Sequence, residues 1–416
     1  MKKVYVYENW KSDEPSLLGT LYIDVLRGSE VYSFEFDKTW LNNPHINILD
    51  PNLHFYSGRQ YINDKNIFGL FSDSAPDRWG RLLLNRRERI IANNESRKPN
   101  KLYESDYLLG VYDETRMGGL RFKTDKEGDF LSSDRATSVP PWKTLRTLEE
   151  AARNFESDDK TLSTKWLNQL IKPGSSLGGA RPKASVKDQS DQLWIAKFPS
   201  KNDDYDIGVW EKIAHDLAKM CGLNVVESKI EKFSQYGTTF LIKRFDRNKK
   251  QRIHFSSAMT MLGKKDGDNS SVGVSYLDIV SFIKSYGASP KKDLKELWKR
   301  IVFNMAISNT DDHLRNHGFL LTKNGWELSP LYDINPIPYG NELSLNITKY
   351  DNTIDINLAI EVAEQFGLSK KESIDLANKI ITTVNENWKN IATKYGVSKK
   401  EMEYMVPAFS TETIKY

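Results

Sequence analysis

The sequence has a single cysteine, Cys221, and no long hydrophobic run, and both features exclude classes of protein. One thiol cannot form a disulfide within the chain, so a disulfide-stabilised secreted fold is excluded. The N-terminal residues lack the apolar stretch of a signal peptide, and no window approaches the roughly 18 apolar residues of a membrane-spanning helix. We therefore expect a soluble, cytoplasmic protein that makes no membrane contact.

Histidine is also scarce, and neither sign of charge dominates. The 6 histidines show no zinc-binding spacing. Lys and Arg number 60 against 56 Asp and Glu, so the net charge of +4 is compatible with an anionic ligand but does not indicate stand-alone nucleic-acid binding. With 39% hydrophobic and 11% aromatic residues among 416, the composition excludes disorder and predicts two or three packed units.

Side chains with catalytic chemistry are concentrated within residues 308–319. The segment places two carboxylates, an imidazole and a carboxamide close together: Asp311, Asp312, His313 and Asn316. Asp333 follows where a short β-hairpin would return the chain beside them. An Asp can orient or deprotonate an attacking hydroxyl, and an Asn with another Asp can hold the Mg²⁺ that bridges nucleotide phosphates. The spacing therefore predicts phosphoryl transfer, with a nucleotide-binding segment upstream.

A glycine-rich segment at residues 174–183 precedes a predicted β-hairpin. Its small side chains let backbone N–H groups approach an anion, although the glycines alone fit a tight turn between strands equally well. Lys197 ends the second strand of the hairpin, where a buried ammonium group favours an anionic partner. Glu211 lies on the next predicted helix, and kinases use such a Lys–Glu pair to fix the α- and β-phosphates. A surface glutamate is the alternative interpretation of Glu211.

Periodicity and cap signals predict the other elements. Strands are expected at residues 3–7, 20–36, 184–186, 193–198, 225–230 and 239–246. Helices are expected at residues 145–156, 164–171, 209–218 and 294–306, with two more beginning at capping boxes at Ser369 and Ser398. Another helix follows Pro76, and its arginines between Arg81 and Arg89 fit a solvated face or, alternatively, a phosphate-binding surface.

Five motifs occur in a fixed order. They are Ser-x-Gly-Gly-Ala-x-Pro-Lys at 176–183, Ile-Ala-Lys-Phe-Pro at 195–199, Lys-Arg-Phe-Asp-Arg at 243–247, Asn-Thr-Asp-Asp-His-x-x-Asn at 309–316 and Leu-Tyr-Asp at 331–333. This series resembles the HipA-like serine/threonine kinases, toxins of bacterial type II toxin–antitoxin modules. The resemblance covers the whole chain.

The resemblance implies an α+β fold: a bilobal protein-kinase-like fold with a small antiparallel β N-terminal subdomain and an all-helical C-terminal lobe. Its expected parts are a HipA-like N-terminal subdomain (1–130), a linker and helix (131–160), a kinase small lobe with the Gly-rich loop (161–248), and a helical kinase lobe with the catalytic loop (249–416).

The same resemblance implies roles for individual residues. Asp311 is the catalytic base, Asn316 and Asp333 are the Mg²⁺ ligands, and Lys197 binds phosphate. The implied ATP-binding residues are Gly178, Gly179, Ala180, Arg181, Pro182, Lys183, Lys197, Lys243, Arg244, Phe245, His313, Asn316, Tyr332 and Asp333, with 243–245 reading adenine through backbone groups. Asp312 is the ambiguous neighbour, and the family spacing selects Asp311. Kinase precedent gives His313 a structural part in the loop, while His317 has no assigned role.

The expected function is that of a Mg-ATP-dependent serine/threonine protein kinase and toxin. It would phosphorylate a cytoplasmic protein such as a component of the translation machinery, and would autophosphorylate Ser176, or Ser175, in the Gly-rich loop. The expected partner is a small helix-turn-helix DNA-binding antitoxin, with DNA contacted only through that complex.

Two alternatives remain open. The first is a small-molecule or lipid kinase, because Asp-x-His-x-x-Asn also resembles lipid-kinase catalytic loops. The second is a mainly non-catalytic co-repressor partner of the antitoxin. The HipA-type N-terminal unit argues against a small-molecule or lipid kinase. A non-catalytic partner is disfavoured because the chain retains all four proposed kinase residues: Lys197, Asp311, Asn316 and Asp333. The segment after Lys197, residues 200–207, is short where family members can carry a longer activation loop, so the substrate is not fixed by the sequence.

Overall fold

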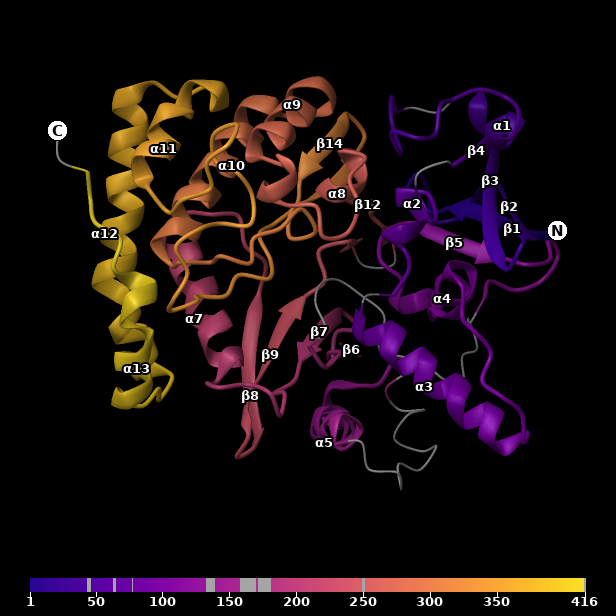
Figure 1. Ribbon diagram of the computed structural model, residues 1–416, viewed down its shortest axis with the longest axis horizontal. Coiled ribbons are helices and arrows are strands. Elements are labelled where there is room, and N and C mark those ends of the chain that lie inside the picture. The colour runs from indigo at the N-terminus through magenta and orange to yellow at the C-terminus, as the bar shows by residue number, and fades with distance from the viewer. Residues whose placement is uncertain are drawn as a thin grey trace. The chain divides into compact units, whose positions relative to one another are not determined.

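The computed structural model describes residues 1–42, 46–62, 65–76, 78–131, 139–157, 170, 181–248 and 251–414. It consists of two compact units, each built from two stretches of chain (Figure 1). The first unit is Met1–Asn202 with Leu241–Ser256, and the second is Asp203–Phe240 with Ser257–Tyr416. Strands β9 (Gly237–Lys243) and β12 (Phe255–Ser257) carry the chain across the unit boundaries. The four-part division expected from the sequence stays a prediction.

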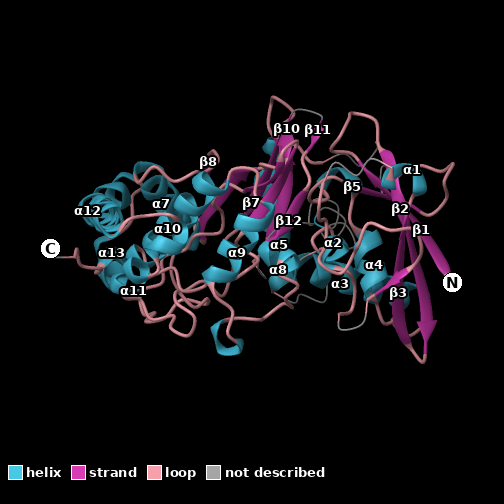
Figure 2. Cartoon of the chain, turned by 90° about the horizontal axis from the view of Figure 1, so that it is seen from above, coloured by secondary structure: helices cyan, strands magenta, loops and turns pink. Residues whose placement is uncertain are grey.

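The first unit contains an antiparallel five-stranded sheet in the order β4-β3-β2-β1-β5 (Figure 2). Its strands are β1 (Lys2–Glu8), β2 (Ser16–Leu26), β3 (Ser29–Phe36), β4 (Gln60–Tyr61) and β5 (Leu120–Lys123). Val4 and Val6 are fully buried, as the alternating pattern predicts. Gly19 is required because a Cβ there would lie 2.3 Å from the carbonyl oxygen of Glu35 on the neighbouring strand. The predicted N-terminal sheet is confirmed.

Short and long helices complete this unit. They are α1 (Lys38–Leu41), α2 (Gly69–Ser72), α3 (Arg78–Asn94), α4 (Glu104–Gly110), η1 (Asp113–Thr115), η3 (Trp142–Thr144) and α5 (Leu145–Glu156). A hairpin of β6 (Lys183–Lys187) and β7 (Leu193–Lys197) follows, and β10 (Arg247–Asn248) pairs with β11 (Gln251–Arg252). The basic helix after Pro76, the 145–156 helix and the predicted hairpin are confirmed, whereas the helix expected at 164–171 lies outside the described residues, save Leu170.

The second unit is mainly helical. It contains α7 (Ile207–Met220), β8 (Ser228–Ser234), α8 (Ala258–Met261), η4 (Ser270–Val272), α9 (Tyr276–Tyr286), α10 (Pro290–Ala306), the hairpin of β13 (Gly318–Thr322) and β14 (Gly325–Leu328), α11 (Ile356–Glu361), η5 (Ala363–Phe366), α12 (Lys370–Lys394), α13 (Lys399–Met405) and η6 (Val406–Phe409). Among the described residues, none of the helices combines the length and the apolar character needed to cross a membrane.

Helix α10 lies at the centre of this unit. Leu297, Trp298 and Ile301 are fully buried, and the indole N–H of Trp298 donates to the carbonyl oxygen of Ala359 at 2.8 Å. Burial of such large apolar side chains supplies most of the stabilisation of a helix in a protein core. The predicted 294–306 helix is therefore confirmed, and it fixes the position of the loop that follows.

The start of β8 differs from the prediction. The strand begins at Ser228 rather than at residue 225, because Val225 instead forms a parallel bridge with Leu331. The amide of Leu331 donates to the carbonyl oxygen of Asn224 at 2.8 Å. The local sequence around Val225 could not predict this pairing, because Leu331 lies far along the chain.

Candidate active site

The loop between α10 and β13 leaves the buried helix through a fixed turn. Ser308 adopts a left-handed backbone conformation with φ of 50°, and the amide of Asn309 donates to the carbonyl oxygen of Asn304 at 2.8 Å. After the β13–β14 hairpin the chain returns, and the hydroxyl of Tyr332 donates to the carbonyl oxygen of Arg315 at 2.7 Å. The hairpin therefore brings the segment of Asp333 back to the loop of Asp311, as the sequence predicted.

The two adjacent aspartates of this loop have opposite environments. Asp311 is exposed, whereas Asp312 is 1% exposed. One oxygen of Asp312, Oδ2, accepts from the hydroxyl of Tyr276 at 2.6 Å and from Nδ2 of Asn304 at 2.7 Å, and lies 2.8 Å from Nε2 of His317. Burial raises the pKa of Asp312, but His317 and these hydrogen bonds outweigh it, and the pKa lies below the ordinary value. Asp312 is a buried, ionised acceptor.

Asn316 is oriented by the backbone of the same loop. Its Nδ2 donates to the carbonyl oxygen of Asp311 at 2.9 Å, and its amide donates to the carbonyl oxygen of His313. The other end of the carboxamide, Oδ1, is buried and has no hydrogen-bond partner within the described residues. The same is true of Oδ1 of Asn335. A buried oxygen without a donor costs free energy unless a cation or water occupies it.

The unpartnered carboxamide oxygens of Asn316 and Asn335 are of the chemical kind that binds a magnesium ion. Mg²⁺ prefers hard oxygen ligands and is commonly held by one or two protein groups together with phosphate oxygens and water. Asp333 has a left-handed backbone with φ of 56°, an uncommon conformation for a residue other than glycine. Among the described residues no group of three His, Cys, Asp or Glu side chains could hold a metal ion. A cation here would depend on the mixed carboxylate and carboxamide pair of Asp333 and Asn316.

The segment after Asp333 is fastened to the same loop. The amide of Ile337 donates to the carbonyl oxygen of Ser308 at 3.2 Å, and the hydroxyl of Ser308 donates to the carbonyl oxygen of Gly340 at 3.2 Å. The hydroxyl of Ser344 donates to the carbonyl oxygen of Thr310 at 2.9 Å. A Cβ on Gly340 would lie 2.1 Å from a side-chain carbon of Thr310, so glycine is required at this close approach.

The first unit contains the described part of the expected nucleotide segment. Lys183 and Lys197 face each other across the β6–β7 hairpin and are 1% and 7% exposed. Pro182 is held by a bond from the amide of Phe198 to its carbonyl oxygen at 2.9 Å. The remaining loop residues, Ser175, Ser176, Gly178, Gly179 and Ala180, lie outside the described residues. Their expected roles stay predictions.

The side chain of Arg244 is buried and forms an ion pair with Asp246. Its Nε and Nη2 donate to the two carboxylate oxygens of Asp246 at 2.7 and 2.6 Å, and its Nη1 donates to the carbonyl oxygen of Thr115. Burial raises the pKa of Asp246, but the guanidinium groups of Arg244 and Arg247 outweigh it and lower the pKa to about 2. The backbone amide of Arg244 already donates to the carbonyl oxygen of Leu193 at 2.9 Å. The family resemblance implied a nucleotide role for residues 243–245 through backbone groups, and the ion pair between Arg244 and Asp246 was not predicted.

Glu211 lies on α7 and is 1% exposed, so the alternative of a surface glutamate is wrong. Lys197 is likewise buried. Buried charges are ordinarily paired because their desolvation is costly. The expected pairing of Lys197 with Glu211 stays a prediction.

Comparison with known proteins places the chain in a family. The HipA-like C-terminal domain matches residues 175–388, more than half of the 416 residues. The chain belongs to the HipA-like C-terminal domain family. This confirms the family expected from the five motifs.

This chain spans about half the length of the curated relatives that it matches. The serine/threonine-protein kinase toxin HipA of Shewanella oneidensis is 28% identical over 201 residues, covering 41% of this chain and 46% of the toxin. A protein of Haemophilus influenzae that carries a provisional kinase name is 30% identical over 187 residues, covering 40% of this chain and 54% of that protein. Both matches are consistent with the family.

A solved structure extends the likeness to nearly the whole chain. The Shewanella oneidensis HipA, in a complex with HipB and its operator DNA, gives a TM-score of 0.68 at 16% identity, covering 98% of this chain and 95% of that chain. At this identity the likeness concerns the fold. The HipA-like chain therefore has the mixed α+β, kinase-like fold expected from its sequence.

Proposed function

We propose that this HipA-like chain is a Mg-ATP-dependent serine/threonine protein kinase and the toxin of a toxin–antitoxin pair. The observation that carries the proposal is the contrast within the loop, where Asp311 is exposed while Asp312 is buried and its Oδ2 contacts Tyr276, Asn304 and His317. An exposed carboxylate on a rigidly held loop can accept the proton of a substrate hydroxyl and orient its oxygen. The kinase name of the Shewanella relative supports the same activity.

Residues of several motifs would contribute to nucleotide binding. Asn316 and Asp333 would hold Mg²⁺, which would neutralise the charge of the nucleotide phosphates. The ammonium group of Lys197, fixed by Glu211, would bind the α- and β-phosphates. The backbone of residues 243–245 would contact the adenine.

An antitoxin is the proposed partner. The structural neighbour was solved with HipB and operator DNA, and we extend such a partnership to this chain. Helix α3 offers a basic surface in which Arg87 and Arg89 are exposed, while Arg81 is neutralised by Glu104 at 2.6 Å. The modest net charge of +4 suits a chain that reaches DNA only through a DNA-binding antitoxin.

Autophosphorylation of Ser176, with Ser175 as the alternative, is the proposed means of self-inhibition. A phosphoserine would bring nearly two negative charges into a loop whose amides otherwise cradle the triphosphate. It would compete for the same N–H donors and repel ATP.

One labelling experiment separates this function from its rivals. The purified chain is incubated with Mg²⁺, γ-labelled ATP and a bacterial extract, with and without EDTA. The proposal predicts EDTA-sensitive label on serine or threonine of a protein. Label confined to lipid or small molecules would favour the small-molecule kinase, and absence of label together with antitoxin binding would favour the co-repressor.

A further inference from the structure

Three tyrosines from distant parts of the sequence meet on the second unit. Tyr205 precedes α7, Tyr339 lies in the segment after Asp333, and Tyr404 is on α13. The ring centroids of Tyr339 and Tyr404 are 5.6 Å apart at 75°, and those of Tyr205 and Tyr404 are 5.9 Å apart at 48°. Tyr339 is 70% exposed and Tyr404 is 40% exposed. We refer to these three residues as the tyrosine cluster.

A group of exposed, mutually packed aromatic rings is typical of a binding surface. Tyrosine supplies a large apolar area at low conformational cost and is enriched among the residues that dominate interface energies. A single exposed aromatic residue needs no such explanation. Tyr350, which is 78% exposed, has a lysine neighbour, Lys349, over its ring and serves as a matched control.

The tyrosine cluster begins at the edge of the candidate active site. Tyr339 lies between Ile337 and Gly340, which are bonded to the carbonyl oxygen and the hydroxyl of Ser308. Gly340 also packs against Thr310, the residue before Asp311. The position of Tyr339 is therefore set by the loop that carries the proposed base.

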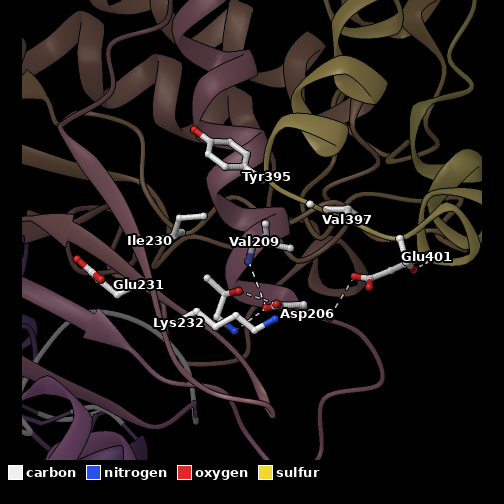
Figure 3. Close-up of a pocket in the computed structure, with 11 residues that line it drawn as sticks. Asp206, Val209, Ile230, Glu231, Lys232, Tyr395, Val397 and Glu401 are labelled. Atoms are coloured by element: carbon white, nitrogen blue, oxygen red, sulfur yellow. Dashed lines mark hydrogen bonds between the residues drawn. The ribbon is translucent and has the colours of Figure 1, made fainter.

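An acidic pocket is lined by residues that lie close in sequence to Tyr205 and Tyr404, and Figure 3 shows this pocket. Its volume is about 310 Å³, and its charged lining residues are Asp206, Glu231, Glu401 and Lys232. Asp206 directly follows Tyr205, and Glu401 lies one helical turn before Tyr404. Figure 3 shows the Glu231 side chain directed away from Asp206 and Glu401. The carboxylates of Asp206 and Glu401 still outnumber the single ammonium group of Lys232, which favours a cationic occupant.

The acidic side chains of the pocket are held in place by the protein. Asp206 accepts from the amide and the hydroxyl of Thr238 at 2.9 and 2.6 Å. One oxygen of Glu401, Oε1, accepts from the indole N–H of Trp210 at 2.8 Å and from the amide of Asp206 at 3.2 Å. These bonds use N–H and O–H donors and leave the negative charges in place, so the pocket is preorganised for a cation.

We propose that the tyrosine cluster and the acidic pocket together dock a protein substrate through a basic segment. An arginine or lysine of that segment would enter the pocket, and the chain around it would cross the tyrosine rings towards Asp311. Guanidinium and ammonium groups are attracted both by carboxylates and by aromatic faces. This inference rests on the proposed protein kinase activity and adds the substrate class.

Peptide binding without nucleotide tests the docking surface separately from catalysis. Two fluorescent serine peptides of equal length, one flanked by arginines and one by glutamates, are titrated with the full chain, and anisotropy is measured. The arginine peptide should bind at least about tenfold more tightly, and Tyr339→Ala or Tyr404→Ala should weaken it about tenfold, the scale of an aromatic interface residue. Glu401→Gln should weaken binding of the same peptide, and Tyr350→Ala should leave it unchanged.

Several results would overturn the inference. Equal binding of the two peptides, or equal binding by wild type and the tyrosine variants, would show that the surface does not select a basic segment. A dimer in sedimentation that Tyr404→Ala dissociates, without peptide binding, would assign the surface to a second copy of the chain. Failure of the proposed kinase activity would be seen separately, as a lack of label transfer from Mg-ATP in the labelling experiment.

Discussion

The carboxylate oxygen Oδ2 of Asp312 lies 2.8 Å from Nε2 of His317, five residues further along the same loop. Tyr276 and Asn304 donate to the same oxygen from α9 and α10. Asp312 therefore joins α9 and α10 to the loop between α10 and β13. Its neighbour Asp311 is left exposed.

Replacing Asp312 should destabilise the second unit. Asp312→Ala removes the acceptor for Tyr276, Asn304 and His317, and loss of one member of a buried charged network costs about 3–5 kcal/mol. Urea unfolding should show a clearly lowered midpoint. Asp311→Ala is the matched control, and its midpoint should stay within about 0.5 kcal/mol of wild type because the side chain is exposed. Equal midpoints for the two variants would contradict a structural part for Asp312.

Acid should weaken the first unit through Asp246. The pKa of Asp246 in the folded chain is about 2, below the ordinary value of about 4. The folded state therefore gains stability from the ionised carboxylate above pH about 4 and loses it as the pH falls from about 4 towards 2. Asp246→Asn should lower stability near neutral pH by about 3–5 kcal/mol, because Arg244 and Arg247 lose their buried partner.

The same variant should flatten the acid dependence of unfolding within that window, measured by urea titrations at several pH values. A variant with the wild-type slope would show that another carboxylate dominates the acid response.

Magnesium binding should depend on Asn316 and Asp333. Asn316→Ala removes the buried Oδ1, and Asp333→Ala removes the proposed carboxylate ligand. In each variant the extra thermal stabilisation produced by Mg²⁺ over ATP alone should largely disappear, because ligand-induced stabilisation follows affinity. Asn324→Ala, an exposed carboxamide in the same unit, should keep the full effect. Retention of the Mg²⁺ effect in both site variants would refute the assignment.

Modification of the Gly-rich loop should silence the chain. After prolonged incubation with Mg-ATP, wild type should lose transfer activity and nucleotide affinity as phosphate accumulates on the 172–183 peptide, whereas Ser176→Ala should stay active. Ser176→Asp should bind ATP weakly from the start. Mass spectrometry that finds this peptide unmodified in wild type with undiminished activity would rule the mechanism out.

Local sequence patterns predicted much of the fold. The hydroxyl oxygen of Ser369 accepts from the amide of Glu372, as the capping signal indicated, and α10 follows its apolar periodicity. Such features depend on neighbours within one or two helical turns. The bridge from Val225 to Leu331 depends on tertiary pairing, so the start of β8 could not be read locally.

The candidate site shows the same limit. Motif spacing proposed Asp311, Asn316 and Asp333 as site residues, which stay predictions, and the hairpin that returns the segment of Asp333 was expected. Spacing alone could not show that Asp312 is buried, because Tyr276 and Asn304 reach it from other elements. The spacing of Arg244 and Asp246 gave only a weak indication of their ion pair, because side chains two residues apart in an extended chain lie on the same face.

We propose that Asp311 acts as the base of a protein kinase. The most direct test is the initial rate of phosphate transfer from Mg²⁺ and γ-labelled ATP to serine or threonine in proteins of a bacterial extract, compared between wild type and Asp311→Ala. Asp311→Ala should lower this rate by about 10²–10⁴-fold and leave the thermal stability unchanged. Transfer by Asp311→Ala at a rate near that of wild type would contradict it.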